Sequence, residues 1–249
     1  MKLWEKSVQV NKDVETYTVG HDRELDVYLA PYDVLGSMAH ITMLESIELL
    51  TREELDLLLN ELKEIYKVAS DGKFTIEDGI EDVHSQVELM LTRKLGDVGK
   101  KIHSGRSRND QVAVDIKLFL RDAILRVKNE TNDLFNLLIQ RSNELKGHLL
   151  PGYTHFQIAM PSSFGLWLGA YAESLVDDMN TLVTAYKISN KNPLGSGAGY
   201  GSSFPLNRKR TTELLNFETL HWNSVYAQMS RGKTEKFVAV AIATIAGTL

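Results

Sequence analysis

The fold is decided by residues 108–146, which read RNDQVAVDIKLFLRDAILRVKNETNDLFNLLIQRSNELK. Apolar side chains recur in this stretch at three- and four-residue steps, and no glycine or proline interrupts it before Gly147. The pattern predicts one continuous α-helix, about 58 Å long at a rise of 1.5 Å per residue. Because a helix of this length buries its apolar stripe only against helices of similar length, we expect a long helical bundle or an oligomeric core.

Toward the C-terminus, the sequence predicts a second long helix over residues 161–190. Pro161 is a favourable first helical residue, and apolar side chains follow it at helical spacing. A glycine- and serine-rich loop is expected over residues 193–205, and a further helix from Asn223 to the end of the chain. This last segment ends in an uncapped apolar run, which predicts that the chain is a fragment of a longer protein.

The residues before the first long helix predict a smaller helical unit. Helical periodicity occurs over residues 32–50, 51–70 and 83–95, with a capping box at Thr51 and a stop at Gly96. No segment shows the sustained alternation that is typical of a strand. We therefore predict an all-α fold. A small N-terminal helical domain, residues 1–103, is followed by the first part of a long-helix bundle domain, residues 104–249.

Composition narrows the class of protein. The chain has 249 residues, 43% of them hydrophobic and 24% charged, which is ordinary for a folded domain. The net charge is −5 without blocks of like charge, which disfavours a general polyanion binder. The absence of cysteine excludes disulfides, thiolate metal sites and cysteine nucleophiles. No secretory signal is visible, and the longest uncharged apolar run, residues 237–249, falls short of the roughly 20 residues of a membrane span. We therefore expect a cytoplasmic protein.

One candidate site lies at the start of the first long helix, where residues 104–111 read SGRSRNDQ. The N-terminal amides of a helix favour anions, and the fork of Arg108 can hold a carboxylate by two bonds. The alternative is a helix cap whose arginines form surface ion pairs.

A second candidate site precedes the second long helix, where residues 151–157 read PGYTHFQ. His155 can transfer a proton near neutral pH, with Thr154 and Gln157 as hydrogen-bond partners. The alternative is a structural role, which is common for a lone histidine in a loop.

Two other patterns favour simpler interpretations. The glycines of residues 195–199 follow a predicted helix rather than a strand, which argues against a dinucleotide-binding loop. The spacing of Glu81, Asp82 and His84 fits no metal signature, so we expect solvated acids at a helix start and predict no metal.

Together and in this order, these segments resemble the fumarase/aspartase superfamily and, within it, the argininosuccinate lyases with their delta-crystallin relatives. Residues 104–112 are similar to the first signature of that family, SGRSRNDQV, and residues 151–157 to the second, GYTHxQ. EDVHS at residues 81–85 and PLGSGA at residues 193–198 resemble two further elements. The resemblance covers nearly the whole chain.

The resemblance implies a cofactor-free elimination in arginine biosynthesis, in which argininosuccinate gives arginine and fumarate by general acid/base chemistry. His155 matches the proton-transfer histidine of the family. The residues that match substrate-binding positions are Ser104, Arg108, Asn109, Thr154, Gln157 and, by position more than by motif, Thr18. The implied partners are the small-molecule substrate and further copies of the chain in a homotetramer, with no nucleic acid and no membrane.

The chain departs from the family pattern in three places. Residues 5–8 read EKSV, where the family has GGRF. The third signature, GSSxMPQKKN, which carries a serine base and substrate-binding lysine and asparagine, is absent. SRGKTEKF at residues 230–237 is longer than the usual S-x-R-D-F. We therefore expect part of an active site and no activity in this chain alone. A non-catalytic assembly relative, or a lyase that acts on another succinyl-amino compound, is the alternative.

The spacing of the two matched signatures has a geometric consequence. Arg108 and His155 lie at opposite ends of the first long helix, roughly 50 Å apart within one subunit at 1.5 Å per residue. If they act together, antiparallel helices of different subunits must bring one chain's Arg108 near another chain's His155.

Overall fold

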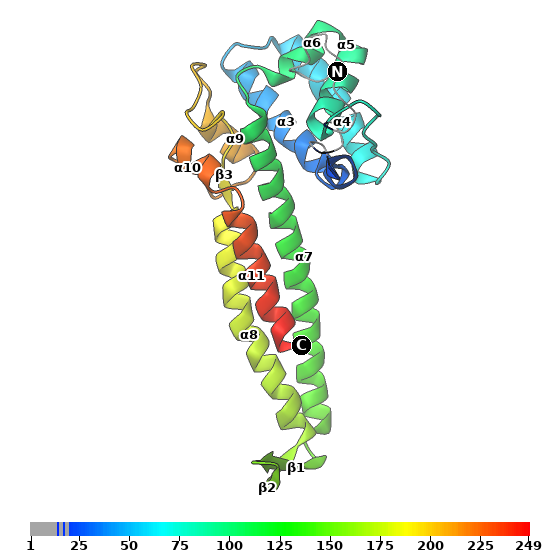
Figure 1. Cartoon of the computed structure of the whole chain (residues 1–249), viewed down its shortest axis with the longest axis vertical. Coiled ribbons are helices and arrows are strands. Elements are labelled where there is room, and N and C mark those ends of the chain that lie inside the picture. Colours follow the sequence, from blue (N-terminus) through cyan, green and yellow to red (C-terminus); the bar gives the residue numbers. More distant parts are fainter. Residues whose placement is uncertain (1–13, 15–16, 18–19) are drawn as a thin grey trace. The chain divides into compact units, whose positions relative to one another are not determined.

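A computed structural model describes residues 14, 17 and 20–249 of the chain. The chain divides into two compact units. Unit 1 comprises the chain up to Phe119 together with Asn190–Arg231, and unit 2 comprises Leu120–Ser189 together with Gly232–Leu249. The helix α7 (Arg108–Leu145) has residues in both units. Helices dominate the described residues (Figure 1), so the all-α prediction is confirmed.

Unit 1 contains a core formed by α3 (Ala30–Ser46), α4 (Arg52–Ser70) and α5 (Val83–Leu95). Their apolar faces bury Val34, Ile41, Leu44, Leu55, Leu58, Leu62, Ile65, Val87 and Leu91. The other elements of unit 1 are α2 (Asp22–Leu25), η1 (Asp26–Tyr28), α6 (Asp97–Lys100), η2 (Lys101–His103), β3 (Lys191–Asn192), α9 (Arg208–Leu214), β4 (Thr219–Leu220) and α10 (Ser224–Met229). Of these, only α10 corresponds to a predicted helix, the one expected from Asn223.

The ends of the short helices follow the sequence signals. At the start of α4, Glu54 N donates to Thr51 Oγ1 (3.2 Å) and Thr51 N donates to Glu54 Oε2 (3.1 Å), which confirms the capping box. At the start of α5, Ser85 N donates to Asp82 Oδ1 (2.9 Å). The helix ends before Gly96, whose φ of 61° is a conformation that glycine adopts without strain.

A second core in unit 1 joins segments that are far apart in sequence. It buries Ala39 of α3, Val114 and Leu118 of α7, and Leu194, Leu215 and Phe217 from the 190–231 segment. A Cβ at Gly36 would lie 3.2 Å from Val114 Cγ1, so a glycine at this position lets α3 approach α7 closely. This core places the predicted glycine-rich loop near the start of α7.

Unit 2 contains the remaining turns of α7, α8 (Phe164–Ser189) and α11 (Lys233–Thr248). The helices α8 and α11 lie side by side (Figure 1), with hydrogen bonds between hydroxyls, such as Ser174 Oγ to Thr248 Oγ1 (3.0 Å). The end of α7 meets the start of α8, because Ser142 Oγ donates to the carbonyl oxygen of Gly165 (2.7 Å). In unit 2, α8 therefore packs along α11, and it meets α7 near the end of that helix.

A β-hairpin precedes α8, and the sequence did not predict it. The antiparallel strands β1 (Leu149–Thr154) and β2 (Gln157–Ser163) place Pro151 opposite Pro161. Both strands of a two-stranded hairpin are edges, so two residues without an N–H group are tolerated. The prediction that a helix starts at Pro161 was wrong. Helix α8 begins at Phe164, where Ser163 Oγ accepts a hydrogen bond from Leu166 N (3.1 Å).

The helix predicted from Asn223 to the chain end is divided into two. Asn223 begins α10 as predicted, because its Oδ1 accepts from Tyr226 N (3.0 Å). The helix stops at Met229, and Gly232, with φ of 75°, precedes α11.

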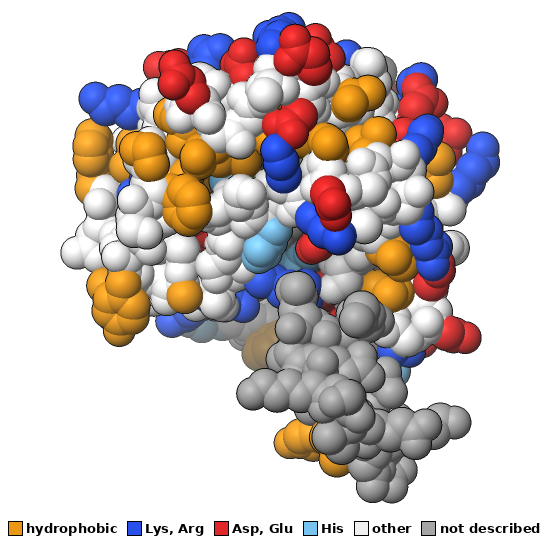
Figure 2. Space-filling model, turned by 90° about the horizontal axis from the view of Figure 1, so that it is seen from above, with side chains coloured by type: hydrophobic (Ala, Val, Ile, Leu, Met, Phe, Trp, Pro, Cys, Tyr) orange, Lys and Arg blue, Asp and Glu red, His pale blue; other side chains and the backbone are white. Residues whose placement is uncertain are grey.

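Within the described residues, no helix combines the length and apolar character needed to cross a membrane. On the face in Figure 2, basic and acidic side chains are interspersed.

The contact between α7 and α8 predicts opposite effects for two glycines. A Cβ at Gly165 would lie 2.5 Å from the carbonyl oxygen of Ser142, so Gly165→Ala forces the helices apart and should cost about 1–3 kcal/mol of stability. A Cβ at Gly169 would meet only Ser142 Oγ, at 3.5 Å, so Gly169→Ala should gain up to about 1 kcal/mol from helix propensity. Thermal unfolding of the full-length variants measures both effects. A Gly165→Ala protein as stable as the unmodified one would contradict the close approach.

Candidate active site

The first turn of α7 is held by side chains of its own sequence. Asn109 N donates to Ser107 Oγ (3.3 Å), and Ser107 N donates to Asp110 Oδ1 (3.0 Å). Ser107 is therefore the N-cap of the helix, with Asp110 as the acid three residues later. The helix therefore begins at Arg108, and the SGRSRNDQ segment leads directly into it.

The second oxygen of Asp110 holds the glycine-rich loop. Asp110 Oδ2 accepts from Gly195 N (2.8 Å) and Gly197 N (3.0 Å). Burial raises the pKa of Asp110, while these amides and the charge of Arg106 act in the opposite direction. The loop thus binds a carboxylate of this protein through its amides.

The guanidinium of Arg108 is occupied by neighbours from the EDVHS segment. Its NH1 forms an ion pair with Asp82, and its NH2 donates to Ser85 Oγ (3.0 Å). Asp82 also caps α5, so the ion pair links the starts of two helices. Arg108 therefore forms an ion pair, as the alternative interpretation expects. A substrate carboxylate that binds Arg108 would have to displace Asp82.

Asn109 and Ser104 lie beside Arg108 in unit 1. Asn109 Oδ1 accepts from Arg231 NH1 (3.0 Å), and Asn109 Nδ2 lies 3.4 Å from Ser107 Oγ. The carbonyl oxygen of Ser104 accepts from His40 Nε2 (2.9 Å), and burial lowers the pKa of His40 to about 3, so this imidazole is neutral. The structure thus brings Ser104, Arg108 and Asn109 together.

The second signature forms the tip of the β1–β2 hairpin. Thr154 and Gln157 are the last pair of the ladder, and His155 and Phe156 form the two-residue turn. Their φ angles are 51° and 59°, which defines a turn that favours Asn-Gly. Two bulky residues with positive φ cost of order 1–3 kcal/mol each, and strain of this kind clusters at functional sites. His155 and Phe156 are both exposed.

The candidate residues therefore fall into three groups. Ser104, Arg108 and Asn109 belong to unit 1. Thr154, His155 and Gln157 belong to unit 2. Thr18 lies outside the described residues. Their predicted roles in binding and proton transfer stay predictions.

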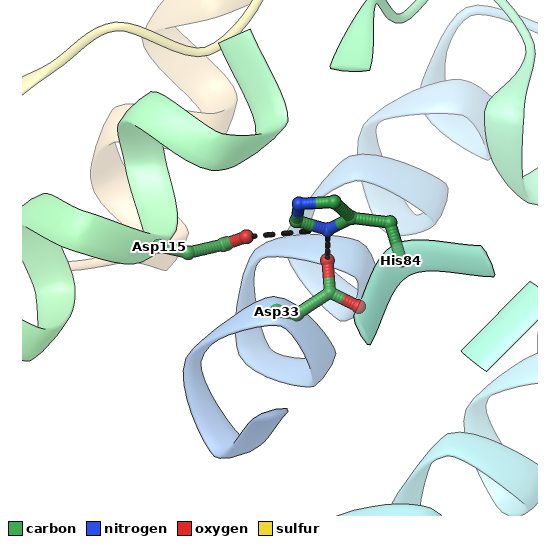
Figure 3. A group of neighbouring side chains, drawn as sticks. All are labelled: Asp33, His84 and Asp115. Carbon is green, nitrogen blue, oxygen red and sulfur yellow. Dashed lines mark hydrogen bonds and ion pairs between the residues drawn. The ribbon is translucent and has the colours of Figure 1, made fainter. Parts of the chain in front are cut away.

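A buried polar cluster lies behind the first group (Figure 3). His84 Nδ1 donates to Asp33 Oδ1 (2.8 Å) and lies 3.6 Å from Asp115 Oδ2. Gln111 Nε2 also donates to Asp33 Oδ1 (2.6 Å). Since these residues come from α3, α5 and α7, the cluster fixes the EDVHS segment, and with it Asp82, against two other helices.

The two carboxyl groups of the cluster differ in protonation. Burial and the neighbouring Asp33 carboxylate raise the pKa of Asp115 well above its usual range, and no donor among the described residues reaches either of its oxygens. Burial acts in the same direction on Asp33, but the charges of His84 and Arg106 and the bond from Gln111 outweigh it and lower the pKa of Asp33. We therefore expect Asp33 to be ionised and Asp115 to carry a proton.

The spacing of this cluster would also allow a metal ion. One ligand atom each from Asp33, His84 and Asp115 lies within 4.8 Å of the other two. However, Asp33 Oδ1 already accepts two hydrogen bonds, and Arg106, whose NH1 donates to Ser37 Oγ (3.0 Å), places a buried positive charge nearby. A proton on Asp115 satisfies the cluster without a metal. The absence of a metal stays a prediction.

Sequence reasoning missed several of these groups. No sequence motif pointed to Asp33 and Asp115, because the cluster unites residues from three helices. Asp82 and Ser85 lie in the EDVHS motif, but only the tertiary structure reveals their contacts with Arg108. Arg231 lies in the segment noted only for its length.

Comparison with known proteins identifies relatives over the whole chain. Residues 3–248 match the family model described as Lyase. An argininosuccinate lyase of Bacteroides fragilis is 70% identical over 248 residues, which are 100% of this chain and 56% of that protein. An argininosuccinate lyase of Thermotoga neapolitana is 40% identical over 237 residues, 94% of this chain and 59% of that protein. The chain therefore spans about half the length of the curated relatives it matches.

Solved structures agree with this fold. EDDS lyase in complex with formate matches with a TM-score of 0.80 and 28% identity, over 98% of this chain and 48% of that chain. A structure described as fumarate lyase:delta crystallin from Brucella melitensis bound to cobalt matches with a TM-score of 0.71, over 94% of this chain and 59% of that chain. At 15% identity, the second match supports the fold alone.

The protonation of the cluster predicts different effects for its two acids. Asp115→Asn should leave stability at pH 7 unchanged or higher, because the amide is uncharged, like the protonated carboxyl that it replaces, and can likewise donate to Asp33. Asp33→Asn should cost about 3 kcal/mol, because it breaks a buried charge pair. Thermal unfolding of the full-length variants measures both.

The pH dependence provides the control. A raised pKa in the folded protein means that the stabilising contribution of Asp115 is complete below its unfolded pKa of about 4 and is lost as the pH rises toward the folded pKa. The advantage of Asp115→Asn over the unmodified protein should therefore grow as the pH increases from about 4. If Asp115→Asn is as destabilising as Asp33→Asn at pH 7, Asp115 is not protonated.

Proposed function

This chain belongs to the lyase family whose model covers residues 3–248, and from that membership we propose that the whole protein is an argininosuccinate lyase. It eliminates fumarate from argininosuccinate to give arginine, without a cofactor, in arginine biosynthesis. The observation that carries the proposal is the 70% identity, over all of this chain, to the argininosuccinate lyase of Bacteroides fragilis.

The chemistry assigns a role to each candidate residue. A base removes a proton beside a carboxylate of the succinyl group, and the resulting carbanion places additional negative charge on that carboxylate. Arg108 and Asn109 bind a carboxylate of the substrate, with Ser104 beside them. His155 transfers a proton, with Thr154 and Gln157 as its neighbours at the hairpin tip. Thr18 is a further substrate contact.

A complete site requires several copies of the whole protein and a third signature that this chain does not contain. The third signature is absent from the sequence, so the described residues supply part of each site and this chain alone is inactive. The whole protein is a cytoplasmic homotetramer, and it binds a small-molecule substrate but no nucleic acid or membrane. The domain division after residue 103 belongs to the same proposal.

Exposed apolar side chains in unit 2 support the oligomer. They lie on the hairpin, α8 and α11 and include Tyr153, Phe156, Ile158, Met160, Leu166, Trp167, Val176, Val183, Val240 and Ile242. Apolar surface of this extent is typical of an interface between subunits. Further copies of the chain would cover it with their own long helices.

A lyase that acts on another succinyl-amino compound is the second candidate. It is supported by the match to EDDS lyase, a variant of which was solved with bound fumarate. The measurement that decides is fumarate release, followed by ultraviolet absorbance, by the full-length protein with argininosuccinate as substrate. Release supports the first proposal. A folded oligomer that does not release fumarate excludes it, and other succinyl-amino compounds then test the second candidate against a non-catalytic assembly role.

The hairpin provides a test of the proton-transfer residue. His155→Asn should preserve the turn, because asparagine tolerates positive φ, but should slow fumarate release by about a hundredfold or more. Steady-state kinetics and thermal unfolding measure the two effects. His148→Asn, at an exposed histidine of the same unit, is the control and should keep full activity. If His155→Asn keeps near-normal activity, His155 does not transfer the proton.

Complementation tests whether the two signatures act across subunits. An Arg108→Ala subunit and a His155→Ala subunit, each inactive alone in the full-length protein, are mixed to form hetero-oligomers. Recovered fumarate release is expected, because some sites then combine an intact Arg108 with an intact His155. If verified hetero-oligomers stay inactive, either both residues act within one chain or one of them has no part in catalysis.

A further inference from the structure

We propose that Arg231 is a positioning residue of the lyase site, because it fixes the side-chain amide of Asn109 for binding a substrate carboxylate. The inference rests on the proposed function, in which Asn109 binds substrate. Its starting observation is the hydrogen bond from Arg231 NH1 to Asn109 Oδ1 (3.0 Å). Arg231 belongs to residues 230–237, the segment that is longer than the family pattern.

The hydrogen bond decides which end of the Asn109 amide faces outward. A guanidinium only donates and a carboxylate only accepts, whereas an asparagine amide has one oxygen and one NH₂ group. Because Arg231 holds the oxygen, the NH₂ group lies on the other side, 3.4 Å from Ser107 Oγ. That distance is long for a hydrogen bond, so the NH₂ group can donate to a substrate carboxylate. A flipped amide would present its oxygen and repel the substrate.

The position of Arg231 is itself fixed by a chain of hydrogen bonds. Arg231 N donates to the carbonyl oxygen of Gln228 (3.2 Å) at the end of α10. Gln228 Nε2 donates to the carbonyl oxygen of Gly197 (3.2 Å), and Gly197 N donates to Asp110 Oδ2 (3.0 Å). Since Asp110 and Asn109 are neighbours on α7, the turn that carries Arg231 is attached to the same helix start that it serves.

Charge also favours an anion at this position. Arg108 is paired with Asp82, whereas the partner of Arg231 within the described residues is the neutral amide of Asn109. A cation near the N-terminus of a helix meets the positive end of the helix dipole, which is unfavourable. A carboxylate bound beside Asn109 would offset the charge of Arg231. It would also accept a hydrogen bond from the NH₂ group that Arg231 orients.

The test uses steady-state kinetics of fumarate release by the full-length protein. Arg231→Ala should raise KM for argininosuccinate by about fivefold to tenfold, the effect of losing one hydrogen bond, with little change in kcat. Arg231→Lys, which keeps a donor, should restore most of the affinity. Arg210→Ala, at an exposed arginine of α9, is the matched control and should leave KM unchanged. If the alanine variant does not fold, Arg231→Met replaces it.

A double variant separates positioning from direct binding. In an Asn109→Ala background, Arg231→Ala should have no further effect on KM, because its action passes through Asn109. An unchanged KM in the single variant overturns the inference, as does an equal KM increase in both backgrounds. A fall in thermal stability without a change in KM also overturns it. If the unmodified protein releases no fumarate, the proposed function fails instead, which distinguishes the two failures.

Discussion

The carboxylate of Asp110 holds the start of α7, and the arrangement of the candidate site in unit 1 depends on it. One oxygen accepts from Ser107 N and the other from the amides of Gly195 and Gly197. The group is fully buried, so leaving these donors unpaired would cost free energy at both the helix and the loop. The single carboxylate therefore defines where α7 begins and where the 193–205 loop lies. It thereby also fixes the positions of Arg108 and Asn109, the first two residues of the helix.

The polar cluster behind this helix start extends the same constraint to α5. His84 donates to Asp33 of α3 and lies close to Asp115 of α7. The segment that carries His84 also carries Asp82. Asp82 in turn pairs with Arg108. Burying so many polar groups is unfavourable unless they are mutually satisfied, so each helix can take only a narrow range of positions. The cluster thus gives the arginine of the first signature a defined place, and Gln111 of the same signature joins it through Asp33.

The second signature is organised by a different physical principle. The hairpin tip places His155 and Phe156 at positive φ, where neither residue is favoured. The local sequence therefore does not stabilise this turn, and the ladder between β1 and β2 has to impose it. Side chains at such a tip project into solvent within one chain, and they become buried only if another surface covers them. Proton transfer at a subunit interface would account for a strained, exposed histidine.

The sequence by itself determined the elements whose signals are local. The unbroken apolar period of residues 108–146 predicted α7 almost to its last residue, and the Thr51–Glu54 box and Gly96 set two helix ends. The two signature segments also supplied the candidate site residues, because motif spacing is a property of the chain. Tertiary structure alone decided the rest. The β1–β2 hairpin is held by hydrogen bonds between its two strands. Its sequence shows neither a helical nor a strand period, because Pro151, Gly152 and Pro161 interrupt the pattern. The pairing of Arg108 with Asp82, and of Arg231 with Asn109, joins residues far apart in sequence, and only folding brings such side chains within the few ångströms that a hydrogen bond requires.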